Sequence, residues 1–175
     1  MHRARAAAYD VAFFIALLST GLALGGALAH LFELPNKINL PREEYFVVQK
    51  AYRGWWQLAY LLAFQLVSTL AVIVMSRRQP RVFWPALLAV LCLTAAQSIF
   101  WTYTFPANVA TENWTKVPED WEALRWRWEY SHAAGAVCQI LAMCGLIVAV
   151  LARARNPGGD VLAEGEHQEL WRSSG

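Results

Sequence analysis

Two histidines in this chain each have a glutamate three residues away, a spacing that occurs in metal-binding and proton-transferring sites. His30-x-x-Glu33 lies near the end of one apolar stretch, and Glu129-x-x-His132 begins another. Residues three apart share a helix face, and bundles that bind two metal ions take ligands from Glu-x-x-His pairs. The two pairs therefore predict either a four-ligand metal site or two histidines that transfer protons or make structural hydrogen bonds. The cofactor is accordingly none or a metal ion.

The second pair belongs to a stretch crowded with arginines and tryptophans. Spacings of three and four place one set of side chains on a single helix face, with a glutamate beside them. This set comprises Trp121, Arg125, Trp128, His132 and the neighbouring Glu129. The other large side chains of the stretch point elsewhere and are predicted to meet lipid head groups; they are Trp126, Arg127 and Tyr130.

The elements that position these residues are predicted to be membrane helices. The chain has 175 residues, 57% of them hydrophobic and 16% charged, which is too apolar for an ordinary soluble domain. A helix needs about 20 mainly apolar residues to cross a bilayer. Segments of that kind lie at about 11–33, 55–76, 82–105 and 131–152. The fold class is therefore all-α: an integral membrane four-helix bundle over residues 1–155, followed by a flexible polar tail at 156–175.

Arginines predict the orientation of the helices. They flank the spans at three places that would share one side of the membrane, whereas the longer loops at about 34–54 and 106–130 mix basic and acidic residues. By the positive-inside rule, both the N-terminus and the C-terminus are cytoplasmic and the longer loops lie outside. Pro118-Glu119-Asp120 is typical of a helix start, so the fourth helix is expected to extend beyond the membrane on the outer side. The flanking arginines are Arg3, Arg5, Arg77, Arg78, Arg81, Arg153 and Arg155.

The beginning of the chain allows a second interpretation, because its apolar run and Ala27-Leu28-Ala29 resemble a signal peptide with a cleavage site. The run from Val11 to Ala29 exceeds the usual length of about 7–15 residues, so we expect this helix to be retained. Gly21, Gly25 and Ala29 recur at intervals of four and form a small-residue face. That face suits close packing within the bundle or against a second copy in a homo-oligomer.

Three glutamines are predicted to lie at a similar depth in the membrane. Gln65, Gln97 and Gln139 each lie roughly eight to ten residues from the outer end of a helix, or about 12–15 Å below the outer face. Polar side chains at such depth face the bundle interior. They either hydrogen-bond between helices or form the polar floor of a cavity whose roof holds His30 and His132.

Charge and cysteine usage exclude other classes. The net charge of +2, without a compact basic run, argues against a nucleic-acid partner. The cysteines all lie inside predicted spans and are expected to be small buried hydrophobic residues; they are Cys92, Cys138 and Cys144.

Several short motifs together resemble a known family. They are Pro35 at the end of the first helix, Tyr52-Arg53-Gly54-Trp55 before the second, Pro106-x-Asn108 after the third, and Trp128 followed by His132. Over residues from about 12 to 152 they resemble the small four-helix membrane proteins of the anthrone-oxygenase-like family. Its members are largely bacterial, so the expected location is a bacterial inner membrane. Fungal members are implicated in oxidising anthrones to anthraquinones.

The resemblance implies a flat, apolar polycyclic phenol as substrate, which enters from the membrane and is oxygenated by molecular oxygen. His132 or His30 would draw a proton from an activated phenolic carbon. The chain departs from the family at Gly135, where many members carry an arginine, so a mechanism that needs a cation at that position is not supported there. Arg125, beside Glu129, or Arg127 would substitute from the turn above, and Arg125 would stabilise the resulting oxyanion. The side chains expected to contact the substrate are Asn108, Trp128, Trp121, Trp55, Gln139, Gln97 and Gln65.

A rival hypothesis is a non-catalytic membrane protein whose outer cap binds lipid or a partner protein and whose histidines are structural. A carrier is the least favoured alternative, because no span has a proline or a run of charges at its centre. Replacement of His132 distinguishes the first two: an enzyme loses activity and keeps its fold, whereas a structural histidine is needed for stability.

Overall fold

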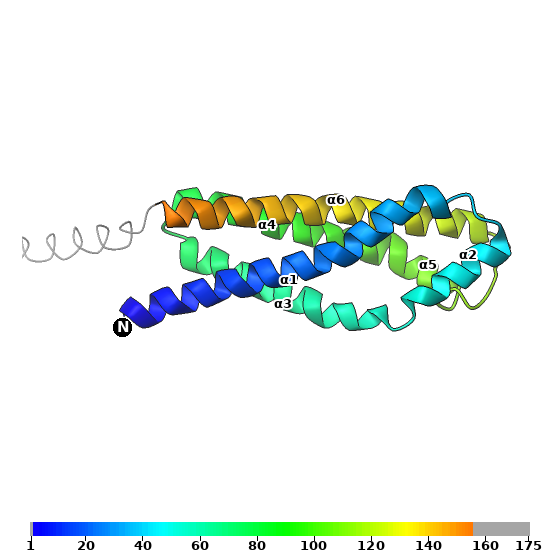
Figure 1. Ribbon diagram of the computed structural model, residues 1–175, viewed down its shortest axis with the longest axis horizontal. Helices are drawn as coiled ribbons and strands as arrows, with labels where there is room; N and C mark the ends of the chain where they lie inside the picture. Colours follow the sequence, from blue (N-terminus) through cyan, green and yellow to red (C-terminus); the bar gives the residue numbers. More distant parts are fainter. Residues whose placement is uncertain (1, 156–175) are drawn as a thin grey trace, which may run out of the picture.

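The computed structural model describes residues 2–155, and this part of the chain is built from helices (Figure 1). Four stretches are long and apolar enough to cross a membrane, with mean hydropathies of 1.8 to 2.4. They are Arg3–Lys37, Trp55–Ser76, Pro80–Ala110 and Trp121–Ala154. The all-helical class and the multi-pass membrane character predicted from the sequence are therefore confirmed. The predicted tail at 156–175 lies outside the described residues.

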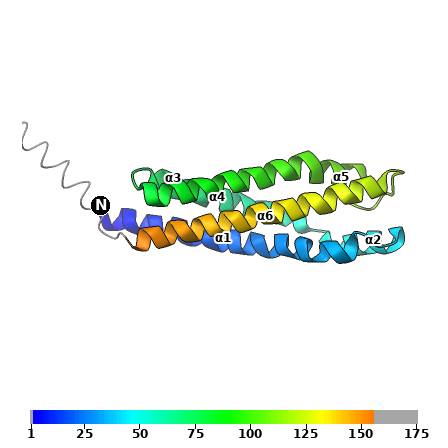
Figure 2. The ribbon, with the colours of Figure 1, turned by 90° about the horizontal axis from the view of Figure 1, so that it is seen from above.

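The long helices run side by side as α1 (His2–Lys37), α3 (Leu58–Ser76), α4 (Pro80–Ile99) and α6 (Trp121–Ala154). Two views show α6 lying along both α1 and α4 (Figure 1, Figure 2). The N-terminus and the end of α6 lie at one end of the bundle, and the short helices α2 (Arg42–Gln49) and α5 (Phe105–Ala110) lie at the other. We call residues 38–57 and 105–120, which cover this second end, the cap.

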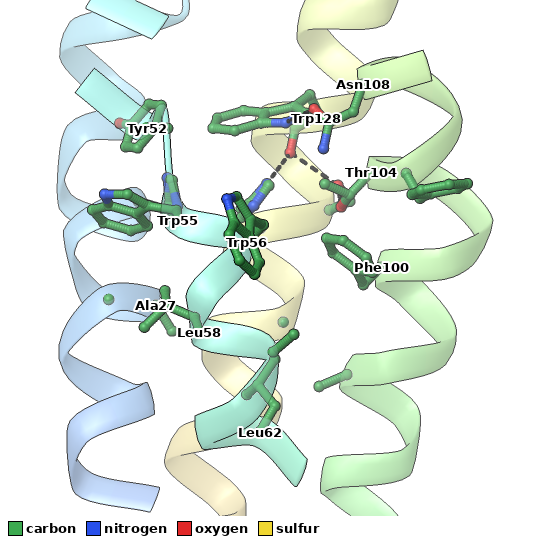
Figure 3. Close-up of a pocket in the computed structure, with 18 of the residues that line it drawn as sticks. Ala27, Tyr52, Trp55, Trp56, Leu58, Leu62, Phe100, Thr104, Asn108 and Trp128 are labelled. Atoms are coloured by element: carbon green, nitrogen blue, oxygen red, sulfur yellow. Dashed lines mark hydrogen bonds between the residues drawn. The ribbon is translucent and has the colours of Figure 1, made fainter. Parts of the chain in front are cut away.

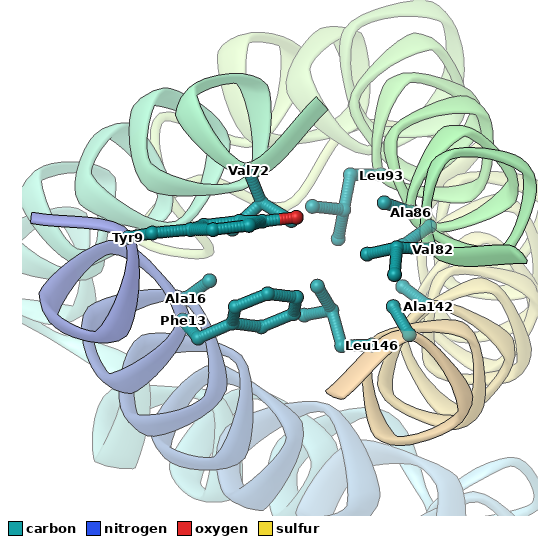
Figure 4. Close-up of a cluster of buried hydrophobic side chains, with 11 residues drawn as sticks. Tyr9, Phe13, Ala16, Val72, Val82, Ala86, Leu93, Ala142 and Leu146 are labelled. Carbon is teal, nitrogen blue, oxygen red and sulfur yellow. The ribbon is translucent and has the colours of Figure 1, made fainter. Parts of the chain in front are cut away.

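A tightly packed apolar cluster fills the end of the bundle near the termini (Figure 4). At its centre, a Cβ atom added to Gly145 of α6 would lie 2.7 Å from the carbonyl oxygen of Pro85 in α4. The two helices therefore cross in backbone contact, as small residues allow in lipid. The buried members of the cluster are Tyr9, Phe13, Ala16, Val72, Val82, Ala86, Ala89, Leu93, Ala142, Leu146 and Ala149. Cys92 packs against this cluster, whereas Cys144 is exposed, so the prediction of three buried cysteines is wrong for Cys144.

Two helices extend further toward the cap than the sequence predicted. The first continues through Pro35 and ends at Lys37, so the loop predicted to begin at residue 34 starts later. The third continues from α4 into a π-helical turn at Phe100–Thr104 and then into α5. In that turn the N–H of Phe105 donates to the carbonyl of Phe100. A wider turn of this kind relieves the clash that Pro106 would cause in a regular helix.

The predicted extension of the fourth helix is confirmed, since α6 has 34 residues and begins at Trp121, directly after Pro118-Glu119-Asp120. At 1.5 Å per residue it is about 50 Å long and exceeds the hydrocarbon core of a bilayer. Trp126 and Tyr130 stack on each other with ring centroids 5.2 Å apart on an exposed face of this helix.

Candidate functional site

A cavity of about 1520 Å³ lies between the long helices on the cap side of the apolar cluster (Figure 3). Helices α1, α3, α4 and α6, the π turn and the cap all contribute to its wall. Most of the residues predicted from the sequence to bind or transform a substrate line it: His30, Trp55, Gln65, Gln97, Asn108, Trp128, His132 and Gln139.

Two histidines from different helices meet at this cavity. The ring centroids of His30 in α1 and His132 in α6 are 4.2 Å apart. The ring of His30 also lies 4.6 Å from Tyr52, 5.2 Å from Trp55 and 5.1 Å from Trp128. Although His30 is buried, its Nδ1 atom has no hydrogen-bond partner among the described residues. An unpaired buried nitrogen of this kind is able to bind a polar group of a ligand.

The hydrogen bond of His132 determines which of its nitrogens acts as a base. Its Nδ1 atom lies 2.9 Å from the carbonyl oxygen of Trp128. A carbonyl oxygen only accepts, so in the neutral imidazole Nδ1 carries the proton and Nε2 keeps its lone pair. Nε2 is therefore the atom of His132 that can take a proton from a molecule in the cavity.

Asn108 holds the cap side of the cavity together. Its Oδ1 atom accepts hydrogen bonds from the indole N–H groups of Trp128 at 2.9 Å and Trp114 at 3.3 Å. Trp114 ends a run of three non-glycine residues with positive φ, which begins at Glu112 and has φ values of 48°, 55° and 63°. Left-handed backbone is strained by about 1–2 kcal/mol per residue. The burial of Trp114 and its bond to Asn108 stabilise this turn against the strain.

The glutamines form the opposite side of the cavity. Gln65 Nε2 donates to Gln139 Oε1 at 2.7 Å and to Thr20 Oγ1 at 3.2 Å, which links α3, α6 and α1. The sequence predicted either hydrogen bonds between helices or a polar side of a cavity. Gln65 and Gln139 do both, because they join helices and also line the cavity. Gln97 lines the cavity too, and it makes no hydrogen bond within the described residues. Its amide group is available to a ligand.

A buried charged cluster behind the aromatic wall was not predicted. Lys37 Nζ lies 3.0 Å from Glu129 Oε1, and their side chains are 4% and 0% exposed. The same ammonium donates to the hydroxyl of Tyr52 at 2.8 Å, and the hydroxyl of Tyr45 donates to Glu129 Oε1 at 2.9 Å. The sequence feature that could have predicted it is the spacing of four between Glu33 and Lys37. That spacing indicates a pair only if the helix continues through Pro35.

Two tyrosines of the cap remain protonated hydrogen-bond donors in this cluster. Burial, reinforced by the negative charge of Glu129, raises the pKa of Tyr45. Burial and the hydrogen bond that Tyr52 donates to Glu33 raise the pKa of Tyr52.

The predicted metal ligands do not converge on one point. His30 and His132 face each other, but Glu33 and Glu129 both turn to Lys37. Among the described residues, no group of three or more histidine, cysteine, aspartate or glutamate side chains is arranged to hold a metal ion. The four-ligand set predicted from the sequence is therefore not assembled, because both carboxylates pair with Lys37 rather than with the histidines.

Three other predicted site residues lie on α6 but do not line the cavity. Arg125 donates to the backbone carbonyl of Leu40 at 2.8 Å and lies over the ring of Trp121, 4.7 Å from its centroid. Arg125, Trp121 and Glu129 are absent from the cavity lining. The oxyanion role expected for Arg125 thus lacks the necessary contact, because its guanidinium is engaged in holding the cap on α6.

Comparison with protein-family models, with curated proteins and with solved structures finds no significant match for this chain.

Proposed function

We propose that this membrane protein binds a flat, lipophilic phenol of the anthrone type in the cavity and oxidises it to a quinone with His132 as a base. The observation that carries the proposal is the convergence of His30, His132 and Asn108 on one large cavity among the candidate membrane helices. Ligand pockets typically combine an apolar, aromatic wall with a few polar groups that fix orientation. The rings of Tyr52, Trp55 and Trp128 would stack on the bound ring system.

The chemistry proposed follows from the geometry and from the resemblance to anthrone oxygenases. Nε2 of His132 takes a proton from the CH₂ carbon of an anthrone-type phenol and leaves a resonance-stabilised anion. That anion reduces molecular oxygen, a carbon–oxygen bond forms, and loss of one water leaves the ketone of a quinone. Overall, one substrate and one O₂ give one quinone and one water. The contact with the oxygen of the anion is assigned to the amide of Asn108, which lines the cavity, rather than to Arg125, which does not.

Binding is tested with two glycines that offer matched room for a side chain. A Cβ atom at Gly135 or at Gly25 meets nothing within 4 Å, and only Gly135 lines the cavity. Gly135→Leu fills the cavity and should weaken the affinity for anthraquinone or naphthoquinone probes, measured by quenching of tryptophan fluorescence, by about tenfold or more. Gly25→Leu should bind as the wild type does. Equal binding by both variants contradicts the proposal.

Catalysis is tested separately by oxygen consumption with an anthrone substrate. His132→Gln should abolish consumption and leave quinone binding and the unfolding temperature near those of the wild type. If it lowers stability and nothing consumes oxygen, the non-catalytic alternative holds. A structural role for this part of α6 is supported by Arg125 and Glu129, which already bond to Leu40 and Lys37.

A further inference from the structure

The lining of the cavity divides into two chemically different zones. The head zone, to which the cap contributes, consists of the ring and amide side chains His30, Tyr52, Trp55, Asn108, Trp128 and His132. The second zone, which we call the aliphatic wall, runs along α3 and α4 and includes Leu58, Leu62, Leu66, Leu93 and Ala96. Figure 3 shows Leu58 and Leu62 below the labelled rings of the head zone. One end of an occupant is thus met by rings and the amide of Asn108, and the remainder mainly by hydrocarbon, interrupted by the amides of Gln65, Gln97 and Gln139.

The cavity also has an opening within the candidate membrane helices. Several of its lining residues are highly exposed, as residues at the edge of an opening are. Trp56, at 68% exposed, lies on the α3 side, and Trp101, at 59% exposed, lies in the π turn. Further residues of both kinds are Ala59 and Ala63 on α3 and Phe105 and Val109 on α5. The opening therefore lies between α3 and the π turn with α5, a side that faces lipid in a membrane.

The size of the cavity exceeds the needs of a ring system alone. Its volume is about 1520 Å³, whereas pockets for drug-sized ligands are about 300–1,000 Å³. An aliphatic wall that leads from the head zone to an opening toward lipid fits a hydrocarbon chain, which loses no hydrophobic contact when it moves from the bilayer into the cavity.

We propose that the occupant is a membrane-resident amphiphile: a phenol or quinone ring that carries a long isoprenoid or acyl tail and enters sideways between α3 and the π turn. The ring lodges against the histidine pair, and the tail lies along the aliphatic wall and leaves through the opening. This inference rests on the proposed function, because it specifies the substrate class of the same cavity.

The experiment uses the full chain in phosphatidylcholine nanodiscs and two naphthoquinones, one with an isoprenoid tail of several units and one with a methyl group in its place. Quenching of tryptophan fluorescence is followed by stopped flow and at equilibrium, with both quinones at equal mole fractions in the lipid. The tailed quinone should bind at least as tightly as the short one. Binding of the short quinone alone overturns the inference and leaves the proposed function standing, whereas binding of neither overturns both.

The route is tested with two exposed alanines of matched size. Ala63 lies at the opening, and Ala95, on α4, is outside the cavity lining. Ala63→Phe narrows the opening and should slow loading of the tailed quinone by about tenfold, as a modest rise in the entry barrier does. Ala95→Phe should load at the wild-type rate. If Ala63→Phe also loads at that rate, entry between α3 and the π turn is wrong.

Discussion

Lys37 at the end of α1 and Glu129 in α6 form a buried ion pair of 3.0 Å directly behind the wall of the cavity. The ammonium lies 4.4 Å from the ring centroid of Tyr52 and 4.7 Å from that of Trp128. Both rings also contact the histidine pair, with Trp128 only 4.0 Å from His132. The ion pair therefore ties two helices together and supports the rings against which the histidines pack.

Removal of the lysine alone should be severely destabilising. Lys37→Met leaves Glu129 buried without its counter-ion, and breaking a buried pair in this way costs about 3–5 kcal/mol. The measurement is the free energy of unfolding in detergent. Lys37→Met combined with Glu129→Gln, which keeps an acceptor for Tyr45 and removes the stranded charge, should recover more than half of the loss.

The control for this pair is a similar pair on the surface. Lys116 lies 3.6 Å from Glu112 with both side chains more than half exposed, so Lys116→Met should change stability by less than about 1 kcal/mol. A Lys37→Met variant as stable as Lys116→Met would show that the buried pair has no structural role.

The helix crossing at Gly145 gives a second prediction. A methyl group there would meet the Pro85 carbonyl oxygen at 2.7 Å, so Gly145→Ala forces α4 and α6 apart and should lower stability by about 1–3 kcal/mol. Gly25→Ala, with open space around its Cβ, should be neutral or stabilising by up to about 1 kcal/mol. The measurement is the thermal unfolding of the two variants, compared side by side. Equal stability would contradict a close contact between α4 and α6 at Gly145.

Replacement of Asn108 should disturb the structure of the cap more than that of any other part of the fold. Asn108→Ala removes the acceptor shared by two indoles and should cost about 1–3 kcal/mol. Near-ultraviolet circular dichroism should weaken at the tryptophan bands, because Trp114 and Trp128 lose their fixed orientation. Asn36→Ala, at an exposed position near the end of α1, serves as the control, and an unchanged spectrum for Asn108→Ala contradicts the assignment.

The glutamines should separate into structural and free members. Gln65→Leu breaks the bonds to Gln139 and Thr20 and should destabilise the protein by about 0.6–1.7 kcal/mol, the range for hydrogen bonds between membrane helices. Gln97→Leu removes no hydrogen bond and should retain full stability. The free energy of unfolding of both variants is measured in a denaturing detergent. An equal loss of stability for the two would contradict the assignment of Gln97 as a residue without a hydrogen bond.

The sequence predicted the fold well where hydrophobic length decides it. Four apolar stretches became four long helices, and the acidic start near Pro118 correctly marked the beginning of α6. It failed at Pro35, because proline is a strong stop signal on its own and the helix is continued by a tertiary contact, the burial of Lys37 against Glu129. Local rules have no access to a partner more than ninety residues away along the chain.

The site was predicted in part for a similar reason. Helical spacing correctly grouped His132 with Trp128, and depth along each span brought the glutamines to one level. Helical spacing does not tell which members of a face turn toward the cavity. It therefore predicted catalytic roles for Arg125 and Glu129, although Arg125 bonds to the cap and Glu129 pairs with Lys37. That choice depends on α2 packing over α6, which the sequence of α6 does not encode.

The most direct test of the account is photo-crosslinking with a naphthoquinone that carries a diazirine on its ring, followed by mass spectrometry of the labelled peptides. The account predicts labels on residues 128–139 of α6 and on residues 52–66, at side chains that line the cavity, and their loss in Gly135→Leu or with excess unlabelled quinone. Labels confined to the outward faces of the helices, such as those of Phe64 and Val67, and insensitive to competition, would contradict it.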